Sequence, residues 1–299
     1  MTPPLLKPGD TVGIAATARK ITPYELAHAV ETFQSWGLKT VFPANVFKAH
    51  NQFSATDEER AADFEELLDN PEVKAIFCAR GGYGSVRIVD LVNWDKITHP
   101  AKWIIGYSDV TVLQCHIYHN YSIASLHGPM AFNITGEETR RQATESIRQA
   151  LMEGRLEYSL PEHLLNRAGD ARGVLVGGNL SVLFSILDSP SFPDMAGKIL
   201  FLEDLDEYLY HIDRMMMGLK RAGKLSDLAG LVIGGMTDMK DNTVPFGKAA
   251  EEIISDIVKE YNYPVYFNFP AGHIHDNRAI VMGVETVIEN NRLEIILAQ

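Results

Sequence analysis

Short apolar runs alternate with amphipathic stretches through the first 120 residues. Four of these runs have the length and composition of buried strands: residues 11–16, 39–42, 73–79 and 102–106. Between them, residues 23–36 and 57–68 place apolar side chains at helical spacing. Strands that alternate with helices in this way predict a parallel sheet with helices on both faces. We therefore expect an α/β N-terminal domain.

The second half of the chain contains more strand segments. It begins with the glycine-containing apolar segment 173–180, which an expected helix follows. The apolar runs 199–202 and 228–234 predict two further strands. Residues 248–261 have the pattern of an amphipathic helix, and three final segments predict a β-meander: residues 279–284, 285–289 and 293–297.

Polar residues, glycines and Pro161 dominate residues 153–172, where we place the domain boundary. The expected division is an N-terminal α/β domain, residues 1–160, and a smaller β-rich C-terminal domain, residues 170–299.

Charge and composition narrow the possible partners. The formal net charge of −12 argues against a general affinity for nucleic acid or an anionic membrane. The N-terminus lacks the basic start and apolar run of a secretory signal, and no stretch reaches the roughly 18 to 20 apolar residues of a membrane span.

Cys78 and Cys115 lie in apolar surroundings, which favours buried thiols over a disulfide. We expect a cytoplasmic protein.

Ser108 stands between the apolar run 102–106 and an expected helix start at residues 109–113. A serine at a tight strand-to-helix turn presents its hydroxyl at the sheet edge, and the backbone N–H of Asp109 then faces any developing oxyanion. The segment 106–110, Gly-Tyr-Ser-Asp-Val, lacks the second glycine of the G-x-S-x-G nucleophile elbow. Helix capping by Ser108 or Asp109 is the commoner role for these residue types, so the motif alone does not decide.

A glycine-rich loop, Arg80-Gly-Gly-Tyr-Gly84, follows the predicted strand 73–79. Its spacing matches neither a P-loop nor a dinucleotide-binding fingerprint. One interpretation is a turn that requires positive φ. The functional interpretation is a second oxyanion donor at the N–H of Gly82, with Arg80 binding a substrate carboxylate.

Acidic residues follow the strand segment 199–202. Glu203 lies at the edge of the core, where a carboxylate needs a partner. Asp204, Asp206 and Glu207 could supply oxygen ligands, but their spacing lacks an EF-hand pattern. We therefore predict no metal site.

Two histidines lie in loops that end apolar runs, His127 and His273. Loop histidines are the better candidates for a general base, because a base must reach the substrate in a cleft. Sequence chemistry does not choose between the two.

Seven segments, in this order along the chain, together resemble the LD-carboxypeptidase family, which also includes the microcin C self-immunity peptidases. They are residues 6–14, 79–84, 105–111, 126–130, 177–181, 200–204 and 270–273. The resemblance implies an N-terminal domain similar to class I glutamine amidotransferases, a smaller β-rich C-terminal domain and a site between them.

By this resemblance Ser108 is the nucleophile, His273 the base and Glu203 the orienting acid, with oxyanion donors at Gly82 and Asp109. The implied activity is that of a serine carboxypeptidase without metal or organic cofactor. Its implied substrate is a murein tetrapeptide, cut between the L-centre of the diamino acid and the terminal D-alanine. The relatives also imply a homodimer. For the substrate carboxylate, Arg80 is the first candidate and Arg278 the second.

Other functions remain open. A microcin C-type immunity peptidase would hydrolyse aminoacyl or peptidyl nucleotides with the same triad, and would need an aromatic face for the base. Trp36, Trp94 and Trp103 all fit core positions, which favours murein peptides. A non-catalytic small-ligand-binding protein is disfavoured by the intact serine, acid and histidine. A glutaminase would need a cysteine at the elbow, and Cys115 lies about two helical turns beyond it.

Overall fold

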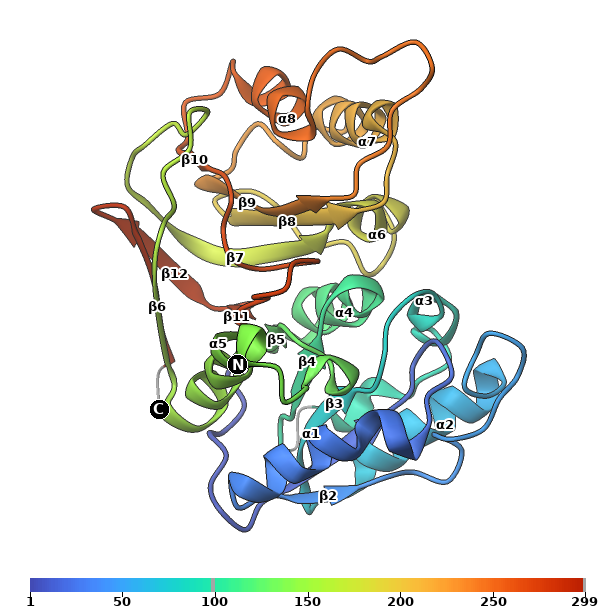
Figure 1. Ribbon diagram of the computed structural model, residues 1–299. Coiled ribbons are helices and arrows are strands. Elements are labelled where there is room, and N and C mark those ends of the chain that lie inside the picture. The colour runs from blue at the N-terminus through green and yellow to red at the C-terminus, as the bar shows by residue number, and fades with distance from the viewer. Residues whose placement is uncertain (98–99, 298–299) are drawn as a thin grey trace.

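The computed structural model describes residues 1–97 and 100–297, which form two lobes with one sheet each (Figure 1). The strand order of the first sheet is β11-β5-β4-β3-β1-β2. Its strands are β1 (Thr11–Ala15), β2 (Lys39–Val41), β3 (Val73–Cys78), β4 (Trp103–Gly106), β5 (Ser125–His127) and β11 (Ile280–Met282). Strands β1 to β5 pair in parallel, which confirms the expected α/β sheet.

Helices pack around this sheet through their apolar side chains, and the first two also cap their own N-termini. They are α1 (Pro23–Ser35), α2 (Asp57–Asp69), α3 (Ser85–Ile88), α4 (Thr111–Tyr121) and α5 (Arg141–Arg148). Thr22 and Thr56 form capping boxes with Glu25 and Glu59, which satisfy N–H groups at the starts of α1 and α2. Five short helical segments complete the lobe: Trp94–Lys96, Ser108–Val110, Ala131–Asn133, Glu138–Arg140 and Gln149–Glu153.

The second sheet combines a parallel part with an antiparallel part. Its strand order is β10-β9-β8-β7-β12-β13-β6. These strands are β6 (Arg155–Ser159), β7 (Ala171–Asn179), β8 (Ile199–Leu205), β9 (Gly230–Thr237), β10 (Val265–Tyr266), β12 (Glu285–Glu289) and β13 (Arg292–Ile296). Strands β7 to β10 are parallel, whereas β12, β13 and β6 pair antiparallel.

Three helices accompany the second sheet: α6 (Leu180–Ser185), α7 (Leu209–Arg221) and α8 (Ala250–Val258). In Figure 1, α7 and α8 lie on the side of this sheet away from the first lobe. Met215 and Met216 are buried in the core, whereas Met217 is half-exposed on α7.

The two lobes share a continuous apolar core. Val110 and Leu113 next to Ser108 belong to the same buried cluster as Leu180 and Leu183 of α6. The backbone N–H of Asn179, at the end of β7, donates to Thr111 Oγ1 at the start of α4 (3.1 Å). This interface therefore fixes the turn at Ser108 against the second sheet.

Strand pairing at the end of the chain differs from the sequence prediction. Strands β12 and β13 pair as expected, but β11 pairs antiparallel with β5 of the first sheet, so the predicted meander is wrong in its first strand. Relative to the expected division near residue 160, β6 joins the second sheet and β11 joins the first. Two- and three-residue strands such as β10 and β5 escaped the prediction because they carry too little pattern.

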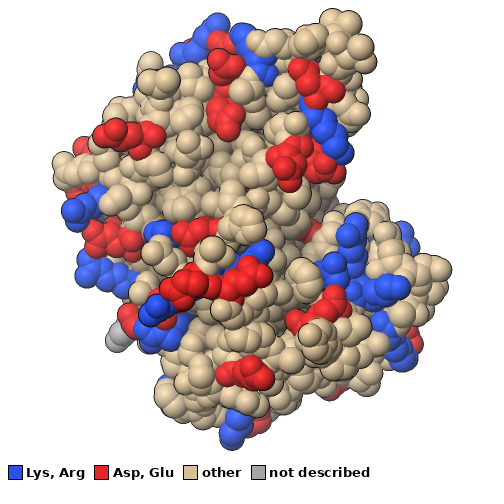
Figure 2. All heavy atoms as spheres, in the orientation of Figure 1, with Lys and Arg blue, Asp and Glu red and all other residues tan. Residues whose placement is uncertain are grey.

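Surface charges of both signs are interspersed over both lobes in the view of Figure 2. None of the described helices combines the length and apolar character required to cross a bilayer. Cys78 and Cys115 are both buried free thiols, as predicted.

Gly177 of β7 provides a test of the packing between β7 and β8. Its φ is +114°, and a Cβ there would lie 2.1 Å from the carbonyl oxygen of Phe201. Gly177→Ala is therefore expected to lower the free energy of unfolding by about 3 kcal/mol or more.

Gly197→Ala is the control, because Gly197 has φ +67° and nothing within 4 Å of its Cβ position. The control should lose only about 1–2 kcal/mol. Urea unfolding measures both, and equal losses would contradict the close strand packing.

Candidate active site

A cleft of about 510 Å³ lies where parallel strands of both sheets end. Its lining includes Arg19 after β1, Gly82 after β3 and Ser108 after β4. From the second lobe come Asp204 of β8 and His273. Open α/β sheets bind ligands in the crevice beyond their carboxyl ends, and here two such edges face the same cleft.

Ser108 occupies a strained turn between β4 and α4. Its φ is +61°, a conformation that side-chain-bearing residues rarely adopt. Gly106 permits the turn, because a Cβ there would lie 2.8 Å from Cγ2 of Val110. Val110 occupies the position of the second glycine in the G-x-S-x-G motif. Gly106, the first glycine of that motif, leaves the space that the Val110 side chain needs. The geometry is that of a nucleophile elbow rather than of a simple helix cap.

Glu203 and His273 form a buried pair on the other side of the cleft. Glu203 is fully buried, and its Oε2 lies 2.6 Å from Nδ1 of His273. The same oxygen accepts the backbone N–H of His273 at 3.1 Å. A Cβ on Gly272 would lie 2.6 Å from Cβ of Glu203, so glycine is required for this contact. The carboxylate therefore holds both the backbone and the ring of His273.

The two partners shift each other's pKa in opposite directions. Burial raises the pKa of the Glu203 carboxyl, but the hydrogen bond and charge of His273 outweigh burial and leave it below its ordinary value. Burial lowers the pKa of His273, but the hydrogen bond and charge of Glu203 outweigh it and leave it above 6.5.

The two loop histidines differ in access to the cleft. His127 is fully buried beside the ring of Phe201, and burial lowers its pKa to about 4, so it stays neutral. His273 lines the cleft, with its ring 4.8 Å from that of Tyr107. Burial raises the pKa of Tyr107 to about 12, so this neighbour is also neutral. Only His273 of these two combines a carboxylate partner with a place in the cleft.

The glycine loop passes beside Ser108. A Cβ on Gly81 would lie 3.6 Å from Cβ of Ser108, and the next residue, Gly82, has φ +114°. The carboxylate of Asp109 accepts the N–H groups of Gly84 (3.2 Å) and Ser85 (2.8 Å). Asp109 was considered as a backbone donor or a helix cap, and the tethering role of its side chain was missed.

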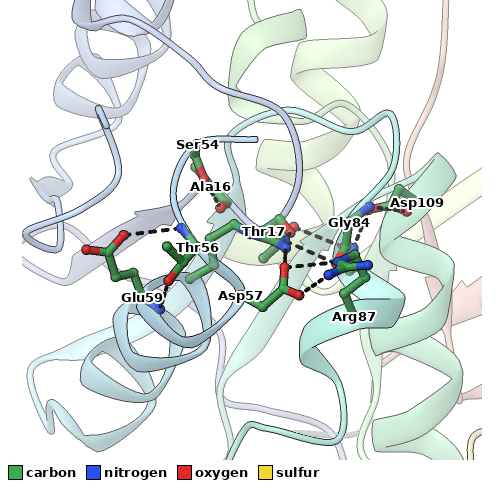
Figure 3. A network of polar contacts seen from close by, with 11 residues as sticks. Ala16, Thr17, Ser54, Thr56, Asp57, Glu59, Gly84, Arg87 and Asp109 are labelled. Atoms are coloured by element: carbon green, nitrogen blue, oxygen red, sulfur yellow. Dashed lines mark hydrogen bonds and ion pairs between the residues drawn. The ribbon is translucent and has the colours of Figure 1, made fainter. Parts of the chain in front are cut away.

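Arg60, on α2, ties the glycine loop to the segment after β1. Its buried guanidinium donates to the carbonyl oxygens of Thr17 and Gly84 and to Asp57. Asp57 also accepts from Arg87, and Figure 3 shows these contacts converging between Thr17 and Gly84. The network fixes two cleft-lining loops relative to each other.

The predicted carboxylate-binding arginines have different surroundings. Arg80 lines the cleft, but its Nη1 donates to Glu25 Oε1 (3.0 Å) and its guanidinium covers the ring of Phe132. Arg278 lines a different cavity and pairs with Asp276, so this second candidate is not supported. The sequence prediction missed Arg19, although its position after β1 marks the same sheet edge.

A metal site would need several ligating side chains together. Within residues 1–97 and 100–297, no three His, Cys, Asp or Glu side chains are grouped closely enough to hold an ion.

Comparison with known proteins decides the family. Residues 12–128 match the model of the LD-carboxypeptidase N-terminal domain, and residues 172–288 match that of its C-terminal domain. The chain belongs to the LD-carboxypeptidase family. This confirms the resemblance seen in the sequence and makes the protein a serine-type hydrolase.

Relatives extend over nearly the whole chain. A protein named as a probable murein peptide carboxypeptidase from Bacillus subtilis is 34% identical over 96% of this chain and 91% of its own length. The crystal structure of muramoyltetrapeptide carboxypeptidase from Oxalobacter formigenes has a TM-score of 0.87 and 26% identity, covering 96% of this chain and 99% of that one. Microcin C7 self-immunity protein MccF in complex with aspartyl sulfamoyl adenosine has a TM-score of 0.89 and 25% identity, covering 100% of this chain and 99% of that one.

The Asp109 side chain can be tested apart from its backbone. Asp109→Ala keeps the backbone N–H but leaves those of Gly84 and Ser85 without their acceptor. We expect a loss of about 1–3 kcal/mol in the free energy of unfolding. We also expect kcat/KM to fall by about 10- to 100-fold, because the glycine loop moves relative to Ser108. Asp90→Ala, at an exposed position, should change stability by less than about 0.5 kcal/mol. Unaltered kinetics in Asp109→Ala would show that the tether does not position the loop.

The raised pKa of His273 predicts how activity depends on pH. Only neutral His273 can accept a proton, so kcat/KM should fall on the acid side with a midpoint above 6.5. Glu203→Gln removes the charge that raises this pKa while burial still lowers it, so the midpoint should move to lower pH. Imidazole proton NMR and the residual pH–rate profile measure the shift.

Asp204→Asn is the comparison, because burial raises the pKa of Asp204 to about 7, in the same range. The charge of Asp204 also raises the pKa of His273, but less than Glu203 does, so Asp204→Asn should shift the midpoint less than Glu203→Gln. If Asp204→Asn moves the acid limb and Glu203→Gln does not, the limb belongs to Asp204.

Proposed function

We propose that this protein is a carboxypeptidase that hydrolyses the LD-peptide bond of murein tetrapeptide and releases the terminal D-alanine during cell-wall recycling. The buried Glu203–His273 pair, facing the same cleft as Ser108, carries the proposal. Further support comes from relatives named as carboxypeptidases of murein peptides, which share nearly the full length of the chain.

In the proposed cycle, His273 Nε2 removes the proton of Ser108 as Oγ attacks the carbonyl carbon at the L-centre of the diamino acid. Glu203 holds the proton on Nδ1 and stabilises the imidazolium that forms. His273 then gives its proton to the leaving amine of D-alanine, which departs and leaves an ester on Ser108. Water, deprotonated by His273, hydrolyses this ester and restores the serine.

Charge that develops on the carbonyl oxygen requires donors on the N-terminal lobe. The N–H groups of Gly82 and Asp109 fill this role in our proposal. One such donor contributes about 2.7–4 kcal/mol to transition-state stabilisation in other hydrolases. The support here is positional, because Gly82 adjoins Gly81, which lies against Ser108, and Asp109 opens the helical turn after it. The cycle needs no metal or organic cofactor.

Hydrolysis of aminoacyl or peptidyl nucleotides is the second candidate, and the similarity to MccF favours it. A nucleotide base needs a free aromatic face on which to stack. The aromatic rings in the cleft lining are Tyr107 and Phe132. His273 packs against the first and Arg80 covers the second. Trp94 and Trp103 are buried in the core. These contacts favour the murein peptide.

Two further parts of the proposal are the location, which the sequence analysis predicts, and the oligomeric state, which the family resemblance implies. We propose that the protein acts in the cytoplasm, where recycled murein peptides are processed, and that it forms a homodimer.

Ser108→Ala tests the nucleophile. We expect the variant to fold normally and to lose D-alanine release by about 10⁴-fold or more, measured by mass spectrometry with murein tetrapeptide. Ser185→Ala, at an exposed serine on α6, is the matched control and should retain full activity. Turnover retained in Ser108→Ala would remove the proposed mechanism. An aspartyl sulfamoyl adenosine assay run in parallel separates the two candidates, since faster hydrolysis of that compound by the unmodified protein would favour the second.

A further inference from the structure

Charged side chains divide the cleft into two walls. The N-terminal lobe contributes two arginines, Arg19 and Arg80, and the second lobe contributes the carboxylates of Asp204, Asp206 and Glu207. Asp206 pairs with Lys240 (2.7 Å) and Glu207 with His211 (2.8 Å). Among the described lining residues the second lobe supplies no Lys or Arg, so a free substrate carboxylate can pair with an arginine only on the N-terminal wall.

The guanidinium of Arg80 already interacts with two protein side chains, Glu25 and Phe132. Its ion pair with Glu25 at 3.0 Å neutralises its charge, and its guanidinium covers Phe132 with 4.4 Å to the ring centroid. Binding a substrate carboxylate would require Arg80 to break the first contact or to share its donors between two carboxylates.

Arg19 differs from Arg80 in both charge and setting. Its side chain is exposed, and no Asp or Glu of the described residues forms an ion pair with it. Its backbone is nonetheless well fixed, because the neighbouring Ala18 carbonyl accepts from Ser54 (3.1 Å) and the Lys20 N–H donates to Gln52 (3.1 Å). A guanidinium whose charge no protein carboxylate compensates is available to pair with an anion.

Arg19 and Ser108 lie against neighbouring residues of the glycine loop. The Arg19 side chain lies across Gly82, where a Cβ would meet its Nε at 2.5 Å. Gly81, one residue earlier and about 3.8 Å away along the chain, lies against Ser108. In a carboxypeptidase substrate, one residue also separates the reacting carbonyl from the terminal carboxylate.

Sheet topology points to the same place. The chain runs from β1 outward to β2 and then returns to β3 on the other side of β1. The crevice between the loops that follow β1 and β3 is therefore the topological switch point, where such sheets bind ligands. Arg19 belongs to the first of these loops and Gly82 to the second.

We infer that Arg19 binds the C-terminal carboxylate of the leaving residue and is the residue that restricts this site to peptides with a free C-terminus. The inference rests on the proposed function and replaces Arg80 in that role. Bound in this way, the peptide lies with its carboxylate on the N-terminal lobe, and the one free amino group of its diamino acid can face the carboxylates of the second wall.

The test compares murein tetrapeptide with the same peptide ending in D-alaninamide. The unmodified protein should prefer the acid by about 10- to 100-fold in kcat/KM, the range of a charge-assisted bond. Arg19→Gln should lower kcat/KM for the acid by a similar factor, mainly through KM, and change that for the amide by less than roughly twofold. Lys20→Gln, the neighbouring exposed cation, should retain the full preference.

Three results would overturn the inference: no preference for the acid in the unmodified protein, an equal loss for both peptides in Arg19→Gln, or loss of the preference only in Arg80→Gln. Calorimetry of Ser108→Ala with both peptides separates this inference from the proposed function. If the unmodified protein turns over neither peptide, the proposed function fails. Tighter binding of the acid to Ser108→Ala, lost in Ser108→Ala/Arg19→Gln, would still support Arg19, and equal binding of both peptides would refute it.

Discussion

The active site depends on one buried carboxylate. Glu203 lies at the end of β8 without solvent exposure, and a charge in that setting destabilises the fold unless a partner compensates it. The partner is His273, held through its ring and its backbone by a single oxygen. Because Gly272 has no side chain, the loop can approach the carboxylate this closely. The requirement to satisfy one charge thereby sets the position of His273, the proposed base.

A second constraint connects this pair across the lobe interface to Ser108, the proposed nucleophile. Thr111, three residues after Ser108, accepts the N–H of Asn179, and Gly178 leaves room for the approach. Asn179 lies opposite Glu203 in the register of β7 and β8. A short path through backbone and sheet therefore joins the turn at Ser108 to Glu203. Relative movement of the lobes would change the position of Ser108 relative to His273, so the buried interface maintains the arrangement on which our proposal depends.

Local patterns were sufficient to predict the parallel first sheet and the strand-to-helix turn at Ser108, since both follow from hydrophobic spacing and glycine placement. Local patterns could not predict which segments contact each other in the folded protein. The three residues of β11 pair with β5, more than 150 positions earlier, and no periodicity encodes that choice. Likewise His127 and His273 look alike in sequence, and only tertiary burial makes the first inaccessible. The tether from Asp109 and the exposed Arg19 were missed because their roles arise from loops brought together by folding.

The adjacent carboxylates of Glu203 and Asp204 on β8 have different hydrogen-bond partners. Glu203 meets His273, whereas Asp204 accepts the side-chain N–H of Asn179 and the backbone N–H of Ser181 at the start of α6. A register shift between Leu202 and Asp204 accompanies this divergence. Asp204 still faces the cleft, where the second lobe supplies carboxylates and, among the described lining residues, no Lys or Arg. An anionic substrate terminus can therefore pair with an arginine only on the opposite wall, and in our proposal this condition gives the bound peptide its direction.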